Sequence, residues 1–158
     1  MVSAFSSLIN GGYYYQPHVV KQIQDENGNV IETNDPTLLR KTVSKQTSDR
    51  VKEALRAVMT DGTGVPANAE GYDIGGKTGT AEKLPRSAHN YLVSFCGFAP
   101  ADDPQLLVYV IIDTPNLPGK EQAHSTFATE IFQKIMTEAL PYLNAVSYTH
   151  LRAHETSQ

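Results

Sequence analysis

Two apolar runs near the middle of the 158-residue chain constrain its fold more than any other feature of the sequence. The runs are NYLVSFCGFA and QLLVYVIID, and the turn-forming segment PADDP separates them. Each run has the length and apolar content of a buried strand. A parallel pair needs a crossover of a dozen or more residues. The short connection therefore predicts an antiparallel hairpin.

The segments before these runs predict more β-structure. The stretch YDIGGKTGTAE precedes the first run and reads as a third strand of the same sheet. Nearer the N-terminus, HVVKQI and NVIE flank DENG, and this pattern is typical of a β-hairpin. Asn27-Gly28 is expected to supply the positive φ angles that a tight turn needs.

Helical periodicity and end signals predict three helices. Asn10-Gly11-Gly12 follows the first helix, and Gly62 follows the second, which carries Asp49 near its start. The predicted helices cover Val2–Leu8, Ser48–Met59 and Glu121–Leu143. The apolar face predicted for the third consists of Phe127, Ile131, Phe132, Ile135, Met136, Ala139 and Leu140. The expected fold class is α+β, an antiparallel sheet flanked by helices.

Composition excludes several functions. A net charge of −4, with no basic cluster among aromatics, argues against nucleic acid as a partner. The longest apolar run, Leu106–Ile112, is far shorter than the ~20 residues that cross a bilayer. The chain begins inside a predicted helix and is expected to be part of a longer protein, with any anchor or export signal upstream. The single cysteine, Cys96, is interpreted as a buried small hydrophobe.

The last residues differ from the rest. From Val146 to Gln158 there is neither helical nor strand periodicity, so this tail is expected to be disordered or foreign to the domain in 1–145. His150 and His154 are spaced like metal ligands on a helix, but no third ligand accompanies them. A polar tail is the favoured interpretation, and no metal or cofactor is predicted.

Two motifs overlap at Lys77. Gly71, four further residues and Gly76-Lys77-Thr78 match the phosphate-loop pattern GxxxxGK[ST]. In addition, the apolar run LLVYVII leads directly to Asp113, as in the strand whose acidic end assists magnesium in such proteins. A phosphate loop follows a buried strand and opens a helix. Here VPANAE upstream is too polar for such a strand, and TAEKLPRSAHN downstream does not sustain a helix. A nucleotide-binding protein remains a disfavoured alternative, which ATP-dependent thermal stabilisation would test.

The second motif is KTG followed by Thr80. On a strand, Thr78 and Thr80 point to one side, and Lys77 and Gly79 point to the other. The two hydroxyls suit a substrate carboxylate, and an exposed strand edge suits an extended peptide. The Thr80 N–H suits an oxyanion, while Lys77 adds positive potential. These features predict an acyl-transfer site.

KTG is also one of three signatures of penicillin-binding proteins and class A β-lactamases. From about Ala4 to Leu143 the chain resembles the second half of the transpeptidase domain of class B penicillin-binding proteins, the septation, elongation or sporulation type. The resembling pieces are SSLINGGYYYQPHVVKQI, MTDGTG, GGKTGTAEK, VSFCGFAPADDPQLLVYVIIDTP and IFQKIM.

The resemblance implies part of a β-lactamase-like fold and a serine-type D-Ala-D-Ala transpeptidase that cross-links peptidoglycan. It implies that Lys77 and Thr80 act in catalysis and that Lys77, Thr78, Gly79 and Thr80 bind substrate. It further implies peptidoglycan stem peptides and β-lactams as ligands, other cell-wall synthesis proteins as partners, and an outward-facing position at the bacterial cell membrane. Gly62 and Gly64 match a family loop and are interpreted as turn-forming.

The family's nucleophile is missing from the sequence. The SxxK and SxN motifs of the family do not occur in this sequence. Ser48 and Ser94 are not followed by a lysine three residues later, and no serine is followed by an asparagine two residues later. Covalent catalysis has no first step without a nucleophile, so the isolated chain is expected to be inert toward β-lactams. A β-lactam sensor domain on the same fold remains an alternative.

Three other groups of residues have both a functional and a structural interpretation. His124 and Ser125 with Asp113 suggest a hydrolase triad, but helix capping is favoured. Tyr13–Tyr15 suggest a ligand platform, but packing in a core or an interface is favoured. Glu82 and Lys83 border the expected groove, although a solvated strand end is favoured, and residues 86–90 are expected to form the following loop.

Overall fold

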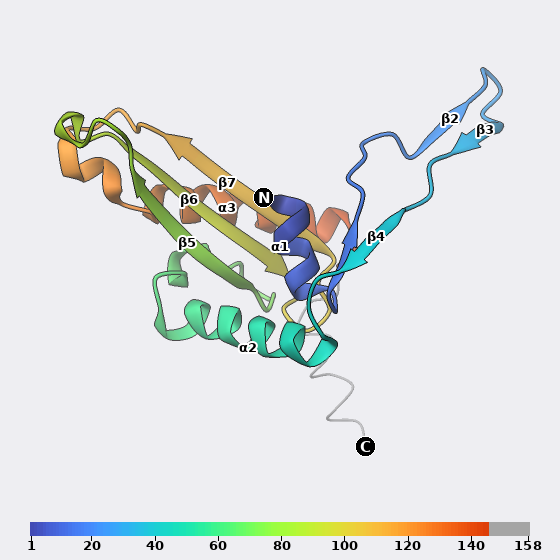
Figure 1. Cartoon of the computed structure of the whole chain (residues 1–158), viewed down its shortest axis with the longest axis horizontal. Coiled ribbons are helices and arrows are strands. Elements are labelled where there is room, and N and C mark those ends of the chain that lie inside the picture. Colours follow the sequence, from blue (N-terminus) through green and yellow to red (C-terminus); the bar gives the residue numbers. More distant parts are fainter. Residues whose placement is uncertain (146–158) are drawn as a thin grey trace. The chain divides into compact units, whose positions relative to one another are not determined.

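The computed structural model describes residues 1–145, which form two compact units, Met1–Asp49 and the part that begins at Arg50 (Figure 1). The interpretation of 146–158 as a disordered or foreign tail, with His150 and His154, lies outside the described residues.

The first unit is a short helix followed by a two-part β-arm. Helix α1 spans Val2–Ile9. Strand β1 (Tyr13–Tyr15) pairs antiparallel with β4 (Leu38–Lys41), and between them β2 (Gln22–Gln24) pairs antiparallel with β3 (Val30–Thr33). The predicted hairpin is therefore confirmed, and the outer pair β1–β4 extends it.

Helix α1 ends where the sequence predicts. The side chain of Asn10 accepts the N–H of Tyr13 at 2.9 Å and donates to its carbonyl at 2.8 Å. Gly11 and Gly12 then take positive φ angles of 90° and 97°. These two glycines turn the chain from the helix into β1.

The tip of the arm is organised by an aspartate. Asp25 accepts the N–H groups of Asn27 and Asn29 at 2.9 Å and 2.8 Å, and the Asn29 amide donates to its other oxygen. These bonds, led by the Asn29 side chain, lower the pKa of Asp25. Gly28 has φ of 83°, but Asn27 does not adopt a positive φ. The prediction of positive φ angles is therefore right for Gly28 and wrong for Asn27, because Asp25 closes a longer loop.

The three tyrosines lie on a strand and do not fill a core. Tyr13 and Tyr15 are exposed. The ammonium of Lys41 lies 5.2 Å from the Tyr13 ring centre, and the guanidinium of Arg40 lies 5.2 Å from that of Tyr14. The predicted packing in a core is wrong, because the long-range pairing with β4 places the rings of Tyr13 and Tyr14 beside cations. Packing in an interface stays a prediction.

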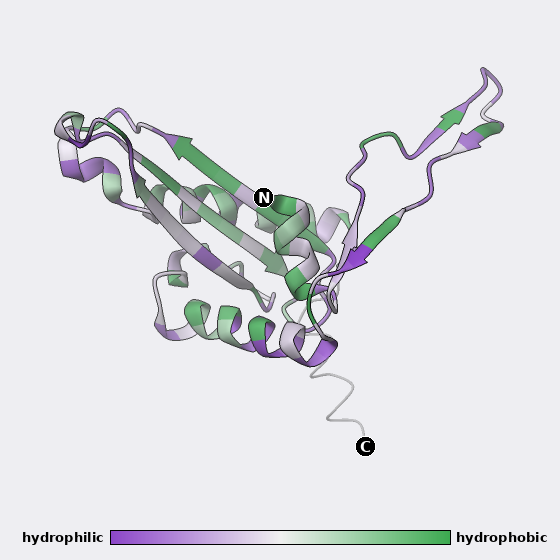
Figure 2. Ribbon diagram, in the orientation of Figure 1, coloured by the Kyte–Doolittle hydropathy of each residue, from purple (hydrophilic) through white to green (hydrophobic). Residues whose placement is uncertain are grey.

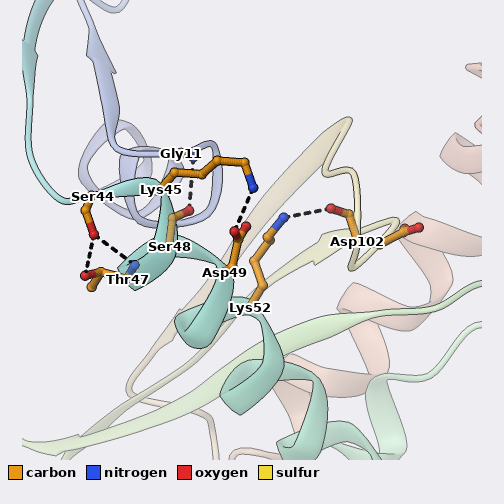
Figure 3. A network of polar contacts seen from close by, with 8 residues as sticks. All are labelled: Gly11, Ser44, Lys45, Thr47, Ser48, Asp49, Lys52 and Asp102. Atoms are coloured by element: carbon orange, nitrogen blue, oxygen red, sulfur yellow. Dashed lines mark hydrogen bonds and ion pairs between the residues drawn. The ribbon is translucent and has the colours of Figure 1, made fainter.

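Helix α2 spans Lys45–Asp61 and begins three residues before the predicted start at Ser48. The cause is a cap, since the Ser44 hydroxyl accepts the N–H of Thr47 at 3.1 Å. Gly62 follows the helix as predicted. The other polar contacts in Figure 3 join Lys45 to Asp49, the N–H of Gly11 to the Ser48 hydroxyl, and the Lys52 ammonium to the carbonyl of Asp102.

The second unit is built on a three-stranded antiparallel sheet of order β5-β6-β7. Strand β5 spans Gly75–Glu82, β6 spans Tyr91–Ala99 and β7 spans Leu106–Asp113. The predicted hairpin of the two apolar runs is confirmed as β6–β7. Figure 2 shows β6 and β7 as largely hydrophobic, whereas β5 is more polar.

Helix α3 spans Thr126–Tyr142 and packs on one face of this sheet (Figure 1). The rings of Phe95 on β6 and Phe132 on α3 meet edge to face, with centroids 4.7 Å apart. The predicted helix began too early, because the separate 3₁₀ turn η3 covers Gly119–Ala123. The buried residues of α3 are Ala128, Thr129, Phe132, Met136 and Leu140.

The predicted apolar face of α3 is only partly right. Ile131 and Ile135 are 42% and 40% exposed, so they flank the buried stripe. Small residues, Ala128 and Thr129, take the buried positions near the helix start. The α+β class with an antiparallel sheet and helices is confirmed. Among the described residues, no helix combines the length and apolar character that a bilayer crossing requires.

Candidate functional site

The KTGT segment lies in the middle of β5, and β5 is an edge strand in the described part of the sheet. Its inner edge pairs with β6, where Lys77 is opposite Cys96 and Thr80 is opposite Val93. The outer edge of such a strand presents main-chain donors and acceptors that an extended peptide pairs with.

Contacts of the glycines show which way the side chains of β5 point. A Cβ on Gly79 would lie 2.6 Å from the Ser94 hydroxyl, whereas a Cβ on Gly76 would lie 2.5 Å from the Phe95 ring. Phe95 faces α3, so Gly76, Thr78 and Thr80 share the α3 side, and Lys77 and Gly79 share the other. The predicted alternation along the motif is confirmed.

The ammonium of Lys77 reaches around the outer edge of β5. Although Lys77 and Thr78 start on opposite faces, the Lys77 ammonium donates to both the carbonyl and the hydroxyl of Thr78, each at 3.2 Å. The flexible four-carbon stem of lysine makes this reach possible. A positive charge and a hydroxyl therefore meet at the open edge of the strand.

A second hydroxyl, that of Thr63, lies 2.9 Å from the Thr78 hydroxyl. Thr63 belongs to the loop after α2 and stands between Gly62 and Gly64. A Cβ on Gly62 would lie 2.7 Å from the carbonyl oxygen of Val58, and one on Gly64 would lie 2.6 Å from the sulfur of Met59. Neither glycine has a positive φ, so the tight packing of this loop against α2 requires them.

Sequence reasoning assigned the loop to structure and missed Thr63. The sequence marks Thr63 only as a single hydroxyl residue between two glycines, fifteen residues before Thr78. Spacing alone does not reveal that the loop returns to β5, because that contact depends on how α2 packs.

The segment before α3 borders the far half of the motif. The Thr80 hydroxyl donates to the carbonyl of Ala123 at 3.4 Å, which is a long and weak contact. Gln122 is buried, accepts the N–H of Tyr91 at 3.1 Å and donates to the carbonyl of Leu117 at 2.8 Å. This amide therefore fixes η3 to the start of β6 beside Thr80.

The end of β5 is tied across the sheet to the end of β7. The Lys83 ammonium donates to Asp113 at 2.5 Å and to the Thr114 hydroxyl at 3.2 Å. The bond from Lys83 is the main cause of the lowered pKa of Asp113. Glu82 accepts the hydroxyl of Tyr91 at 3.3 Å. Both residues that border the expected groove thus have partners within the sheet.

Cys96 lies opposite Lys77 and is buried, as predicted. Burial raises the pKa of its thiol to about 11. The thiol is therefore neutral at physiological pH and behaves as a small apolar side chain.

Neither the phosphate loop nor the hydrolase triad, the two disfavoured alternatives, agrees with the structure. Strand β5 continues through Lys77 to Glu82, so no helix begins at the phosphate-loop motif. The Asp113 carboxylate is bound by Lys83 and Thr114. Ser125 takes the N-cap position of α3, although its side chain makes no capping bond. The capping prediction is thus right about its place and wrong about the bond.

A small cavity of about 200 Å³ lies at the start of β5, lined by Arg56, Gly71, Tyr72 and Asp73. Arg56 pairs with Asp73 at 2.6 Å, and burial nevertheless raises the pKa of Asp73. No group of three or more metal-ligating side chains occurs within residues 1–145.

Comparison with known proteins gives a consistent result. Residues 1–137 match the family model described as the penicillin binding protein transpeptidase domain. The chain is 41% identical to stage V sporulation protein D of Bacillus subtilis over 146 residues, which cover 90% of this chain and 22% of the relative. It is 31% identical to penicillin-binding protein PbpB of Mycolicibacterium smegmatis, over 85% of this chain and 22% of the relative.

Solved structures agree with these relatives. The chain superimposes on penicillin binding protein 3 of Mycobacterium tuberculosis, solved in complex with ampicillin, with a TM-score of 0.76 and 26% identity over 92% of this chain and 34% of that one. It also matches a D,D-transpeptidase domain from Eggerthella lenta, with a TM-score of 0.69 and 30% identity over 88% of this chain and 32% of that one. The chain spans about a fifth of the length of the curated relatives.

Proposed function

Because the chain belongs to the family of penicillin-binding protein transpeptidase domains, we propose that it supplies the substrate-binding strand of a peptidoglycan D,D-transpeptidase. The substrates in this proposal are stem peptides that end in D-Ala-D-Ala, and β-lactams act at the same site. Related proteins named peptidoglycan D,D-transpeptidase and a family neighbour solved with ampicillin support this choice of ligands.

One observation carries the proposal: the Lys77 ammonium lies 3.2 Å from the Thr78 hydroxyl at the open edge of β5. A cation and a hydroxyl so close together suit the terminal carboxylate of a peptide. The open main-chain edge of the same strand suits the peptide backbone beside that carboxylate.

Each residue of the motif has its own part in the reaction. The Thr78 hydroxyl binds the substrate carboxylate, and Thr80 adds a second hydroxyl together with an N–H for the oxyanion. Gly79 lies on the opposite face of β5, where its missing side chain leaves room for the hydroxyl of Ser94. Lys77 holds positive potential at the carboxylate. One preorganised oxyanion donor contributes on the order of 3 kcal/mol to transition-state stabilisation.

The covalent step needs a serine that is not among the 158 residues. Its hydroxyl oxygen bonds to the penultimate D-Ala carbonyl, the peptide bond breaks, and the terminal D-Ala leaves with the transferred proton. The amine nitrogen of a second stem peptide then bonds to the same carbonyl carbon, the ester bond to the serine oxygen breaks, and a proton of the amine returns to that oxygen, which completes the cross-link. We place this reaction on the outer side of the bacterial cell membrane, together with other cell-wall synthesis proteins.

A hybrid protein tests the proposal. Residues 1–145 replace the superimposable segment of penicillin binding protein 3 of Mycobacterium tuberculosis, which supplies the rest of the domain. A fluorescent penicillin should label this hybrid covalently. Lys77→Ala should slow labelling on the order of a hundredfold, because the positive charge at the site is lost.

Two controls make the test decisive. Lys134→Ala, at an exposed position of α3, should leave the labelling rate unchanged. The isolated 158-residue chain should remain unlabelled, since it has no SxxK motif. A hybrid that melts cooperatively but takes no label, or that labels equally well with Lys77→Ala, would refute the proposed function.

A further inference from the structure

The Thr78 hydroxyl has two neighbours, the Lys77 ammonium at 3.2 Å and the Thr63 hydroxyl at 2.9 Å. We propose that Thr63 is a positioning residue, whose hydroxyl donates to Thr78 and thereby turns the Thr78 proton toward a bound carboxylate. This inference rests on the proposed function, because it concerns how the same site recognises its anionic ligand.

Counting protons leads to this role. A threonine hydroxyl has one proton to donate and two lone pairs that accept. The Lys77 ammonium only donates, so it occupies one lone pair of Thr78. If Thr63 donates into the second lone pair, neither of these two neighbours accepts the proton of Thr78. That proton then points toward the ligand. If Thr78 donated to Thr63 instead, its proton would be turned away from the ligand.

A carboxylate decides between the two orientations. An anion at Thr78 accepts the outward proton and favours the chain of donors that runs from Thr63 through Thr78 to the ligand. Hydrogen bonds in such a chain polarise one another, and bonds to a charged acceptor are stronger than neutral ones. Thr63 therefore strengthens binding of a carboxylate more than that of a neutral ester or amide, because a neutral carbonyl oxygen accepts a weaker hydrogen bond.

The loop holds Thr63 in position for this role. The N–H of Gly64 donates to the carbonyl of Val58 at 3.2 Å, and the side chain of Asn68 donates to the carbonyl of Met59 at 2.9 Å. Both bonds fasten the loop to the end of α2. Gly62 and Gly64 have no room for a Cβ there, so the close packing of the loop fixes the approach of Thr63 to β5.

The test compares an acid with its ester in the hybrid protein described above. Thr63→Val keeps the shape of the side chain but removes the hydroxyl. We expect the acylation efficiency toward a carboxylate-bearing penicillin to fall about fivefold, the usual effect of one hydrogen bond. Efficiency toward the methyl ester of the same penicillin should fall clearly less, because its neutral carbonyl accepts a weaker hydrogen bond, and Thr63→Ser should restore the value for the acid.

The outcomes separate the two proposals. No labelling of the unmutated, folded hybrid refutes the proposed function. Normal labelling with no effect of Thr63→Val, or an equal loss for acid and ester, refutes the positioning role alone, because a merely structural loss would affect both ligands equally.

A measurement on the 158-residue chain itself remains decisive if the hybrid does not fold. N-acetyl-D-alanyl-D-alanine should shift the amide resonances of Thr78 and Thr80, with an affinity about fivefold weaker in Thr63→Val. The affinity for the C-terminal amide of this dipeptide should differ clearly less between the unmutated chain and Thr63→Val. Equal affinity of both chains for the free acid refutes the role of Thr63, whereas no carboxylate-dependent shift in the unmutated chain refutes both proposals.

Discussion

Gly79 leaves room on β5 for the hydroxyl of Ser94 on β6. A Cβ at this position would lie 2.6 Å from that oxygen, which is closer than packed atoms allow. We therefore expect Gly79→Ala to lower the free energy of unfolding by about 1–3 kcal/mol, as added methyl groups do in a packed site. Denaturant unfolding followed by circular dichroism measures this change.

A second substitution tests the cause. Ser94→Ala removes the crowded oxygen, so the double variant Gly79→Ala/Ser94→Ala should recover most of the lost stability. The matched control is Gly76→Ala, whose Cβ would meet the ring of Phe95 and the carbonyl of Cys96. Ser94→Ala should not rescue that variant. Equal rescue of both, or of neither, would contradict the contact between Gly79 and Ser94.

Several residue-level features follow from the sequence alone. Strand alternation is local, so the sequence predicts correctly that Thr78 and Thr80 face away from Lys77. Burial of Cys96 follows from its apolar surroundings. The roles of Thr63 and Ser94 do not follow from the sequence. Thr63 acts through its contact with Thr78, fifteen residues away, and Ser94 acts through its contact with Gly79 on the neighbouring strand. Such contacts depend on packing that no local pattern encodes.

At the level of elements, Lys83 links β5 to β7 across the sheet. Its ammonium donates to Asp113, and this bond is the main cause of the lowered pKa of that carboxyl. Because the folded-state pKa is lowered, the contribution of Asp113 to stability is present above the unfolded value of 3.8 and is lost as pH falls through the lowered value.

Lys83→Met should therefore raise the pKa of Asp113 toward 3.8, as measured by carboxyl ¹³C NMR titration. The pKa of Asp113 should not reach this value completely, because the Thr114 hydroxyl still donates to the carboxylate at 2.8 Å. Lys120→Met, at an exposed position of η3, is the control and should leave this pKa unchanged. An unchanged pKa in Lys83→Met, or an equal shift in the control, would contradict the link.

Element boundaries show where sequence reasoning fails. The β6–β7 hairpin is predictable because a short turn joins its strands. The pairing of β1 with β4 is not, since more than twenty residues separate Tyr15 from Leu38. Helix α2 starts early because Ser44 caps it, and the apolar pattern does not include that cap. On α3, Ile131 and Ile135 fit the helical period but lie at the margin of the buried stripe.

For the whole molecule, the sequence predicts the α+β class but not the contrast between well-buried and exposed β-structure. In β6 every residue from Val93 to Ala99 is buried, whereas every residue of β2 and β3 is exposed. A two-stranded hairpin without a hydrophobic face against it is only marginally stable. Different parts of the chain should therefore open with different free energies.

Hydrogen exchange measured residue by residue tests this contrast. Amides of Gln22–Gln24 and Val30–Thr33 should exchange at least about a hundredfold faster than those of Val93–Ala99, because the hairpin opens locally while β6 exchanges only on global unfolding. The pair β1–β4 is the internal comparison, since β1 also contacts α1, and its protection should be intermediate. Protection of β2–β3 equal to that of β6 would mean that the hairpin is covered in solution, and it would contradict the exposure of every residue of these two strands in this structure.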